Sequence, residues 1–540
     1  MASPSKAINS TVNPIIPGFA PDPTIIKHMG KYWLVNSTFQ FFPGLPVYHS
    51  TDLTHWTHAH NAISRPSQLS VLRSSADLIT ARNPDAPNTK LCFQGGLYAP
   101  TLRYHAPSST FYLLCTNIVR PDRADQTVSE AQNFWITCRD LEVGEWSDPT
   151  YFEFEGIDPS IWFEEEEQQE GGKKTRAYVV GSRGPGPGTK INLFEVDLES
   201  GKKLSEEKTL WEGERKSYPE GPHIYQEGGW YWLLIAEGGT HEGHCINVAR
   251  SKELWGPYES NPGNPIVRAV PYGEDVQCTG HMDLVEGEDG QWFGVCLGIR
   301  RSGEKGVRMT HGRETFLTRV WWPESEEGWL RAEKVELGVE GKQRDGNCVP
   351  KVEKGRDGLD LLWVREPTLG DYVIEGDGVR VKVKSSKGDL SQWEEPVSFV
   401  GKRQRLTEAR SEVTLRTDGA GKGLKAGLVV YKDEHRFVRI FLDGDKKVKW
   451  ELLNKAKDLA DSKELDHGIT GQDLWLQISY DEEKYIFAYK ESKGAQWTKV
   501  IEMDHAQLSG PDFVGPVIGV FATGEVGQEV KFEDFMVDIE

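Results

Sequence analysis

The sequence predicts an all-β protein in two parts, a five-bladed β-propeller followed by a jelly-roll-like β-sandwich. Three observations support this prediction. The composition, with Gly 56, Pro 29, Trp 18, Tyr 17 and Phe 21 among 540 residues, favours turns and strands, and no long amphipathic helix is present. One strand pattern repeats five times in the first 335 residues, and a period-two pattern fills much of the remainder. We expect a propeller domain over residues 1–340 and a sandwich domain over residues 345–540.

The repeated pattern is a small or acidic residue, usually a proline, one polar residue and then an apolar run. Its five copies are Ala20-Pro-Asp22-Pro-Thr-Ile25, Tyr98-Ala-Pro-Thr-Leu102, Gly156-Ile-Asp158-Pro-Ser-Ile161, Tyr218-Pro-Glu220-Gly-Pro-His-Ile224 and Thr279-Gly-His281-Met-Asp-Leu284. Each copy has the features of a turn that leads into a buried strand.

A second strand, rich in aromatic residues, follows each copy. These strands are Gly30-Lys-Tyr-Trp33-Leu-Val35, Ser109-Thr-Phe-Tyr112-Leu-Leu114, Thr175-Arg-Ala-Tyr178-Val-Val180, Gly229-Trp-Tyr-Trp232-Leu-Leu234 and Gly290-Gln-Trp292-Phe-Gly-Val295. In the first, second and fourth units a further strand leads to Trp56, Trp146 and Trp255. Units of roughly 50–75 residues with about four strands each are typical of propeller blades. Five such units occupy roughly residues 14–335.

The propeller geometry explains why acidic residues recur at one place in the repeat. The innermost strand of every blade lines the central channel, so equivalent positions converge at one end of the axis. Alignment on the proline puts five residues in one column, namely Asp22, Ala99, Asp158, Gly221 and His281, with Glu220 displaced by one residue. A single Asp-Pro or Glu-Gly pair is usually an ordinary turn. Three acids in matching apolar-flanked strands favour a functional site.

Three carboxyl groups around one small cavity suit the hydrolysis of a glycosidic bond. This reaction needs one carboxylic acid that protonates the leaving oxygen and one carboxylate on the other face of the sugar ring. A third carboxylate nearby raises the pKa of the acid and keeps it protonated. The formal charge of −20, from 63 Lys and Arg against 83 Asp and Glu, repels nucleic acid and anionic lipid. We therefore expect a small neutral oligosaccharide as the partner, and neither nucleic acid nor a membrane.

The chain resembles glycoside hydrolase family 43 at a series of motifs. They are Asn13-Pro-Ile-Ile-Pro-Gly-Phe-Ala-Pro-Asp22, the segment from Asn36 to Trp56, Gly156-Ile-Asp158-Pro-Ser, Pro219-Glu220-Gly-Pro-His, Ala236-Glu-Gly-Gly-Thr240, Gly280-His281-Met-Asp-Leu and Gly312-Arg313-Glu-Thr-Phe. The resemblance runs from about residue 13 to residue 330 and includes all three acids in order. It implies a five-bladed propeller that hydrolyses its substrate with inversion of configuration.

The resemblance implies a role for each polar residue of these motifs. Asp22 is similar to the general base that activates water, Glu220 to the general acid, and Asp158 to the residue that raises the pKa of Glu220 and orients it. Arg313 would hydrogen-bond a sugar hydroxyl and influence the acids, and Thr240 is a further candidate for substrate binding. Without its motif, Arg313 would be interpreted as a strand-end arginine in an ion pair.

Three aromatic residues are candidates for the walls of the sugar site. By the resemblance, Phe39 and Tyr98 would pack against the sugar ring, and Phe513 would close the pocket from a loop of the sandwich. Plain core packing is the alternative for each ring. The chain departs from the family at Tyr98, where tryptophan is expected, and in the glycine-rich stretch at residues 179–188. We therefore expect the leaving-group subsite to differ.

His281 would lie near the propeller axis, where some family members bind a calcium ion or a water cluster. Calcium takes six to eight oxygen ligands, so an imidazole with waters would be an unusual, structural site. A lone histidine beside a strand more often finds an ordinary hydrogen-bond partner. We expect no required cofactor and keep a structural Ca²⁺ ion at His281 as an option.

The second part alternates apolar and polar residues between short turns. The clearest runs are Val379-Arg-Val-Lys-Val-Lys384, Ala426-Gly-Leu-Val-Val-Tyr431, Arg436-Phe-Val-Arg-Ile-Phe-Leu442 and Leu474-Trp-Leu-Gln-Ile-Ser-Tyr480. Period two with one polar face is typical of an antiparallel sandwich. This half resembles the β-sandwich of the β-xylosidase branch of the family, after a crossing between Gly338 and Gly358.

Seven scattered cysteines, mostly inside apolar runs, are expected to be reduced and buried. The chain has no run of 18 apolar residues and no signal peptide, which favours a cytoplasmic location, with secretion after signal removal as the alternative.

We expect an inverting exo-glycosidase that releases single pentose units, foremost xylose from the non-reducing end of β-1,4-xylooligosaccharides. An α-L-arabinofuranosidase, or an enzyme with both activities, is the alternative within the class, because the two sugars present similar hydroxyls. A carbohydrate-binding protein without catalysis is the alternative from another class. The sequence leaves the oligomeric state open.

Overall fold

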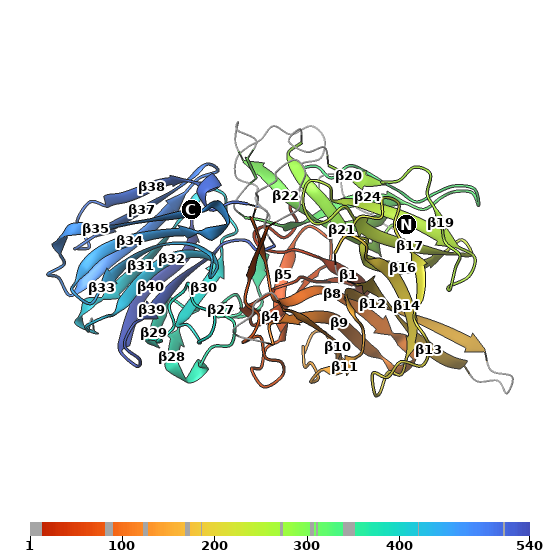
Figure 1. The fold of residues 1–540 in the computed structure, drawn as a ribbon, viewed down its shortest axis with the longest axis horizontal. Coiled ribbons are helices and arrows are strands. Elements are labelled where there is room, and N and C mark those ends of the chain that lie inside the picture. The colour runs from red at the N-terminus through yellow and green to blue at the C-terminus, as the bar shows by residue number, and fades with distance from the viewer. Residues whose placement is uncertain are drawn as a thin grey trace, which may run out of the picture.

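The computed structural model describes residues 13–80, 90–121, 128–167, 173–184, 186–269, 274–302, 307–308, 311–337, 352–419, 421–510 and 513–540. Two all-β parts lie side by side, the propeller and the sandwich (Figure 1). Helical structure in these ranges is limited to short 3₁₀ turns at Ala106–Ser108, Leu369–Asp371, Thr417–Gly419, Lys455–Lys457 and His505–Gln507. None of them is long or apolar enough to cross a membrane. The all-β prediction is confirmed.

The first part consists of five sheets, each an antiparallel blade whose first strand is innermost. Blade one is β1 (Thr24–His28), β2 (Lys31–Val35), β4 (Gly44–Ser50) and β5 (Trp56–Ile63); blade two is β8 (Gly96–His105), β9 (Thr110–Val119), β10 (Glu130–Cys138) and β11 (Thr150–Phe152); blade three is β12 (Gly156–Glu167), β13 (Lys173–Arg183), β14 (Lys190–Val196) and β15 (Lys208–Trp211); blade four is β16 (Glu220–Glu227), β17 (Trp230–Glu237), β18 (Cys245–Ser251) and β19 (Glu259–Ser260); blade five is β21 (Val276–Glu286), β22 (Trp292–Ser302), β24 (Glu314–Trp321) and β25 (Arg331–Ala332). The five predicted inner strands are therefore β1, β8, β12, β16 and β21, which contact one another around the axis.

Short strands extend some blades. β20 (Val267–Arg268) pairs with β18, β23 (Val307–Arg308) pairs with β22, and β6 (Asp77–Thr80) and β7 (Lys90–Phe93) form a hairpin between blades one and two.

The predicted aromatic second strands fill the spaces between blades. Apolar clusters lie between blades one and two around Trp33 and Phe111, two and three around Trp135 and Val179, three and four around Val180 and Leu233, four and five around Trp232 and Phe316, and five and one around Phe293 and Leu34. Each blade thus buries both of its faces. This agrees with the sequence, because strands that are apolar at nearly every position must be covered on both sides.

The N-terminal segment links the last blade to the first. The side chain of Asn13 accepts a hydrogen bond from the Leu317 amide at 2.9 Å and donates one to the Leu317 carbonyl at 2.9 Å. Ile16 forms a bridge with Thr315 in β24. The chain then enters β1, so residues 13–20 tie blade five to blade one and help close the ring.

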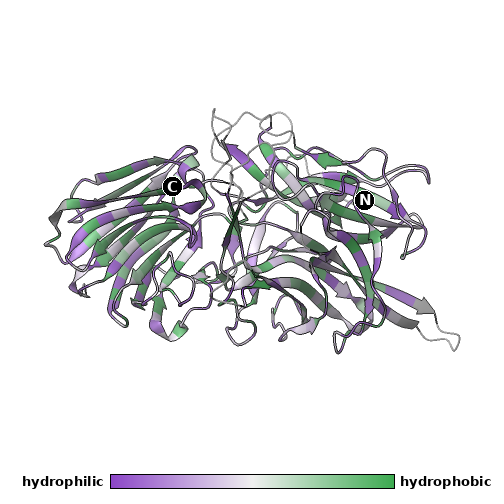
Figure 2. Ribbon diagram, viewed as in Figure 1, coloured by the Kyte–Doolittle hydropathy of each residue, from purple (hydrophilic) through white to green (hydrophobic). Residues whose placement is uncertain are grey.

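The second part is a sandwich of two antiparallel sheets. One sheet is β28 (Tyr372–Glu375), β29 (Arg380–Lys384), β40 (Glu529–Ile539), β31 (Ala409–Arg416), β36 (Asp473–Tyr480), β37 (Lys484–Lys490) and β38 (Thr498–Asp504); the other is β30 (Phe399–Arg403), β39 (Val517–Thr523), β32 (Lys425–Asp433), β33 (Arg436–Asp443), β34 (Lys447–Asn454) and β35 (Leu459–Gly468), each in spatial order. Hydrophobic and hydrophilic residues alternate along these strands (Figure 2), and every second residue of β34 and β36 is buried. The sandwich prediction is confirmed.

The crossing between the two parts stays attached to blade one. The expected boundary at residues 340–345 lies outside the described residues, which resume at residue 352. There β26 (Val352–Lys354) runs parallel to β5, and β27 (Trp363–Val364) pairs with β3 (Phe41–Phe42). The chain therefore keeps contact with the propeller up to residue 364, although Leu362 already forms a bridge with Gly401 of the sandwich.

The side chains of Cys92, Cys115, Cys138, Cys245, Cys278 and Cys296 are buried, and no two of them form a disulfide within the described part of the chain; Cys348 lies outside it.

Candidate active site

One backbone feature marks the aligned column in every blade. All five positions have a left-handed φ, namely Asp22 at 49°, Ala99 at 36°, Asp158 at 55°, Gly221 at 57° and His281 at 51°. In the second to fifth blades the pairing of the inner strand with its neighbour also shifts register here. A bulge bends the strand and re-aims its side chains, and such strain in non-glycine residues gathers at functional sites. The column thus has one shape in five different sequence contexts.

Asp22 is held as a hydrogen-bond acceptor on both oxygens. Arg313 Nη1 donates to Oδ1 at 3.0 Å and Ser37 Oγ donates to Oδ2 at 2.7 Å. The Ser37 oxygen in turn accepts the amide of Ala99 at 2.7 Å. A buried carboxylate with a guanidinium partner is stabilised as an anion. This is the state that a base needs.

Asp158 is linked to Glu220 through the backbone of blade four. Oδ2 of Asp158 accepts the amide of Gly221 at 3.0 Å, so Asp158 is bonded to the residue next to Glu220. Burial raises the pKa of Asp158 to about 6. Burial also raises the pKa of Glu220 well above its ordinary value, and the charges of Asp158 and Asp22 raise it further. The Glu220 side chain is 20% exposed against 7% for Asp22, so Glu220 is the more accessible to a ligand.

Arg313 connects the acids to the sandwich. Besides Asp22, its Nη1 donates to Thr240 Oγ1 at 2.9 Å, while Nε and Nη2 donate to the carbonyl of Phe513 at 3.3 and 3.1 Å. The guanidinium also lies over the rings of Phe39 and Phe513, at 5.4 and 5.0 Å from their centroids. Arg313 therefore contacts four other predicted site residues that are far apart in the sequence, namely Asp22, Phe39, Thr240 and Phe513.

The three predicted aromatic residues pack on one another. The ring of Phe39 lies 4.8 Å from that of Tyr98 and 5.9 Å from that of Phe513, and Tyr98 lies 6.3 Å from Phe513. Phe39 is fully buried, whereas Tyr98 and Phe513 keep 6% and 9% exposure. In this structure Phe39 therefore supports the other two rings, and contact with a sugar by Phe39 stays a prediction.

His281 lies near Asp158 on one side and near His223 on the other, and the His223 side does not fit a calcium ion. Arg103 donates to Nδ1 of His223 at 3.1 Å, so a neutral His223 carries its hydrogen on Nε2. That ring lies 6.3 Å from the ring of His281. Imidazoles and an N–H donor do not supply the oxygen ligands that calcium takes. The described residues contain no group of three or more His, Cys, Asp and Glu placed to hold a metal.

A second polar layer lies two to four residues further along the inner strands, and the sequence prediction missed it. Asp283 accepts hydrogen bonds from both terminal nitrogens of Arg103 at 2.9 Å, from Thr24 Oγ1 at 2.7 Å and from the Tyr225 hydroxyl at 2.6 Å. Although burial opposes ionisation, the Arg103 charge holds the pKa of Asp283 well below its usual range. Period two from the aligned column would have indicated these residues. The layer fills the axis beyond the acids.

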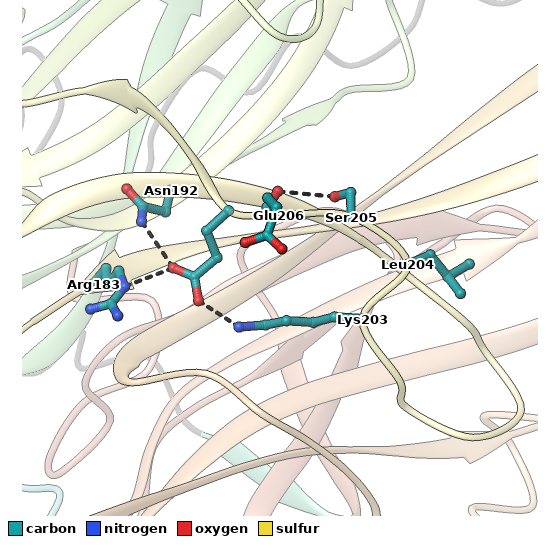
Figure 3. A pocket seen from close by; sticks show the side chains of 7 residues that line it. Arg183, Asn192, Lys203, Leu204, Ser205 and Glu206 are labelled. Carbon is teal, nitrogen blue, oxygen red and sulfur yellow. Dashed lines mark hydrogen bonds and ion pairs between the residues drawn. The ribbon is translucent and has the colours of Figure 1, made fainter.

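A polar hollow on blade three does not belong to this site. It has a volume of about 720 Å³ and is lined by Arg183, Asn192, Lys203, Leu204, Ser205, Glu206 and Glu207 (Figure 3). Glu207 accepts hydrogen bonds from Arg183 at 2.8 Å and Asn192 at 2.9 Å, so this carboxylate already has partners within the hollow. The stretch expected to alter the leaving-group side does approach the acids at another point, where the Pro187 carbonyl accepts the amide of Tyr218 at 3.0 Å.

Comparisons with known proteins find matches to both parts of the chain. Residues 11–330 match the family described as glycosyl hydrolases family 43, and residues 353–538 match the beta xylosidase C-terminal concanavalin A-like domain. A non-reducing end alpha-L-arabinofuranosidase of Bacteroides ovatus is 31% identical over 99% of this chain and 95% of its own. A xylosidase/arabinosidase of Butyrivibrio fibrisolvens is 38% identical over 80% and 79%. The structure of a xylan beta-1,4-xylosidase from Bacillus halodurans C-125 aligns with a TM-score of 0.79 at 27% identity, covering 97% of this chain and 98% of that one.

Proposed function

The chain belongs to glycosyl hydrolase family 43 and is a glycoside hydrolase, and from this premise we propose that it removes single β-1,4-linked xylose residues from the non-reducing end of xylooligosaccharides with inversion. The observation that carries the proposal is the grouping of three acids at one end of the axis, in which Asp22 accepts a hydrogen bond from Arg313 while burial and the charges of Asp158 and Asp22 raise the pKa of Glu220.

The proposed reaction assigns one proton transfer to each of two acids. The Asp22 carboxylate takes a proton from a water molecule, whose oxygen attacks the anomeric carbon. Glu220 gives its proton to the glycosidic oxygen as the bond between that oxygen and the anomeric carbon breaks. Attack and departure on opposite faces of the ring invert the configuration. Asp158 supports this division of roles. Together with burial, its charge raises the pKa of Glu220, whereas Asp22 accepts a hydrogen bond from Arg313.

Exo action is supported by what lies on either side of the acids. The Asp283 layer fills the axis on one side, and the ring of Phe513 approaches Tyr98 and Arg313 on the other. We infer that only the terminal residue of a chain fits between them. The second polar layer is fully hydrogen-bonded at Asp283, so a sugar chain could not displace it without leaving a buried charge unpaired.

An α-L-arabinofuranosidase is the second candidate. The relative that matches 99% of this chain bears that activity in its name, and another relative is named for both activities. Both sugars are pentoses, and the same acids serve either one.

The discriminating experiment is a paired assay of the purified protein on xylobiose and on an aryl α-L-arabinofuranoside. We expect xylose from xylobiose, with a higher kcat/KM than for the arabinofuranoside. Turnover of the arabinofuranoside alone would replace the first candidate by the second. Glu220→Gln serves as the control, and unchanged turnover of xylobiose by that variant would remove the mechanism.

A further inference from the structure

His244 faces Glu220 from blade four, immediately before β18. Its Nε2 lies 3.7 Å from Oε1 of Glu220, and its Nδ1 lies 3.1 Å from the carbonyl oxygen of Cys278. The side chain is 1% exposed. Nothing in the sequence motifs marks this residue as part of the site, yet it is a buried, titratable ring directed at the general acid.

The hydrogen bond to Cys278 fixes which nitrogen of His244 carries the hydrogen. A carbonyl oxygen only accepts, so Nδ1 must be the donor. Burial lowers the pKa of His244 to about 3, so the ring is neutral. In a neutral imidazole the second nitrogen is then an acceptor. Nε2 therefore presents a lone pair toward Glu220, and it has no other hydrogen-bond partner among the described residues.

The ring of His244 is held in this position by the backbone of β21. A Cβ on Gly280 would lie only 2.2–2.3 Å from three atoms of the imidazole, so a glycine is needed where the ring crosses the strand. Cys278 and Gly280 together place the ring without help from Glu220. The acceptor is thus present before the acid is protonated.

Other charged and titratable groups face Glu220 from the remaining inner elements. They are Asp158 of β12, Asp22 before β1 and Arg313 before β24, while His281 of β21 acts on the His244 ring. The two carboxylates favour the protonated form of Glu220 through their charge, and Arg313 opposes them. His244 differs from these groups because it could favour the protonated form through a hydrogen bond to the proton itself.

We propose that His244 is a positioning residue for the general acid, whose Nε2 accepts a hydrogen bond from the protonated carboxyl of Glu220 and holds the proton donor until transfer to the leaving oxygen. The present separation exceeds a hydrogen bond by about 0.7 Å, and such contacts often tighten in the substrate complex. Once Glu220 has lost its proton, the same lone pair faces an anion, which favours rapid reprotonation. The proposal rests on the assignment of Glu220 as the acid.

Two substitutions distinguish the roles of the two ring nitrogens of His244. In His244→Asn the amide nitrogen takes the place of Nδ1 and keeps the bond to Cys278, but the acceptor toward Glu220 is lost. In His244→Gln the amide oxygen reaches the place of Nε2 and keeps that acceptor. His60→Gln is the matched control, because His60 is also buried and bonded to a carbonyl, that of Leu141 at 2.8 Å, on the outer part of blade one.

The readout is the pH profile of kcat/KM on xylobiose and on an aryl xyloside with an acidic phenol as leaving group. For His244→Asn we expect the basic limb to move to lower pH and activity on xylobiose to fall by about 10²-fold, with a smaller loss on the aryl xyloside, which needs less proton donation. His244→Gln should keep the limb within a few tenths of a pH unit of wild type. His60→Gln should leave both substrates unchanged.

An unmoved basic limb in His244→Asn, or equal losses on both substrates, would overturn the proposal. Should that variant fail to fold, His244→Phe fills the ring volume without an acceptor, and the same two results in that variant would overturn the proposal equally. Glu220→Gln on the same two substrates tests the underlying assignment separately. If that variant shows no dependence on the leaving group, the proposed acid is wrong whatever the His244 variants do.

Discussion

At the scale of single residues, the three carboxyl groups of the site differ in their hydrogen-bond donors and in the charges near them. Asp22 has an arginine and a serine as donors, whereas Glu220 has carboxylates nearby and no donor within hydrogen-bond distance among the described residues. The three acids could be predicted from the sequence because they stand in repeated motifs. Ser37 and His244 could not, since their role depends on contacts with residues 62 and 24 positions away, at Ala99 and Glu220, that no motif records.

Asp158 should control the pH range of activity. A general acid works only while protonated, so activity is lost as the pH rises through the pKa of Glu220. Burial and the charge of Asp158 both raise that pKa, and Asp158→Asn removes the charge. We therefore expect the basic limb of kcat/KM on xylobiose to begin at lower pH in this variant, with a loss of about 10²-fold or more at neutral pH.

The matched control for this prediction is Asp148→Asn. Asp148 is 77% exposed and pairs with Arg65 at the surface, so its loss removes one charge without touching the site. The same displacement of the limb in both variants would show that net charge, and not the contact with Glu220, sets the pH range.

At the scale of strands, the site depends on a bulge that recurs in the inner strands. The repeat predicted which strands are innermost and which positions align, because side chains alternate and the proline marks the register. It could not predict the left-handed φ values at Asp22 and Asp158, which most residues avoid and which the surrounding blade imposes. The offset of Glu220 by one residue follows from this geometry, as Gly221 holds the left-handed position in blade four.

Gly221→Ala tests whether the shape of the column matters for catalysis. At Gly221 φ is +57°, and a Cβ would lie 2.8 Å from Nδ1 of His281; at Gly228, in the turn after the same strand, φ is +59° with open space around the Cβ. Both variants should lose about 1 kcal/mol of unfolding free energy from the left-handed alanine. Only Gly221→Ala should also lower kcat/KM, by about tenfold or more. Equal kcat/KM in the two variants would mean that catalysis does not depend on the column's shape.

At the scale of the whole molecule, the sandwich contacts the candidate active site. One apolar cluster joins the two parts, with Phe39 and Tyr98 from the propeller and Phe437, Phe513 and Phe521 from the sandwich. The hairpin between β32 and β33 adds buried polar contacts, since Glu434 accepts the Ala76 amide at 2.7 Å and Asp433 accepts from Gln94 at 2.8 Å. Period two predicted the sandwich strands, but not this interface, whose polar partners lie more than 300 residues apart in the chain.

Phe513→Leu should weaken substrate binding more than folding. The carbonyl of Phe513 and its bonds to Arg313 remain, while the ring that faces Tyr98 is lost. We expect KM for xylobiose to rise severalfold with a smaller change in kcat, and unfolding to be easier by about 1 kcal/mol. Phe487→Leu, in the fully buried interior of the sandwich, should show a similar stability change with KM unchanged. A rise of KM in both variants would mean that stability alone is being measured.

The central claim is that Asp22 activates water while Glu220 protonates the leaving oxygen, and this fixes the stereochemistry of the product. Time-resolved proton NMR of xylobiose hydrolysis, begun before mutarotation equilibrates the anomers, tests it most directly. We predict that the xylose released from the non-reducing end first appears as the α anomer. Appearance of β-xylose first would mean retention through a covalent intermediate and would contradict the role of Asp22 as a base.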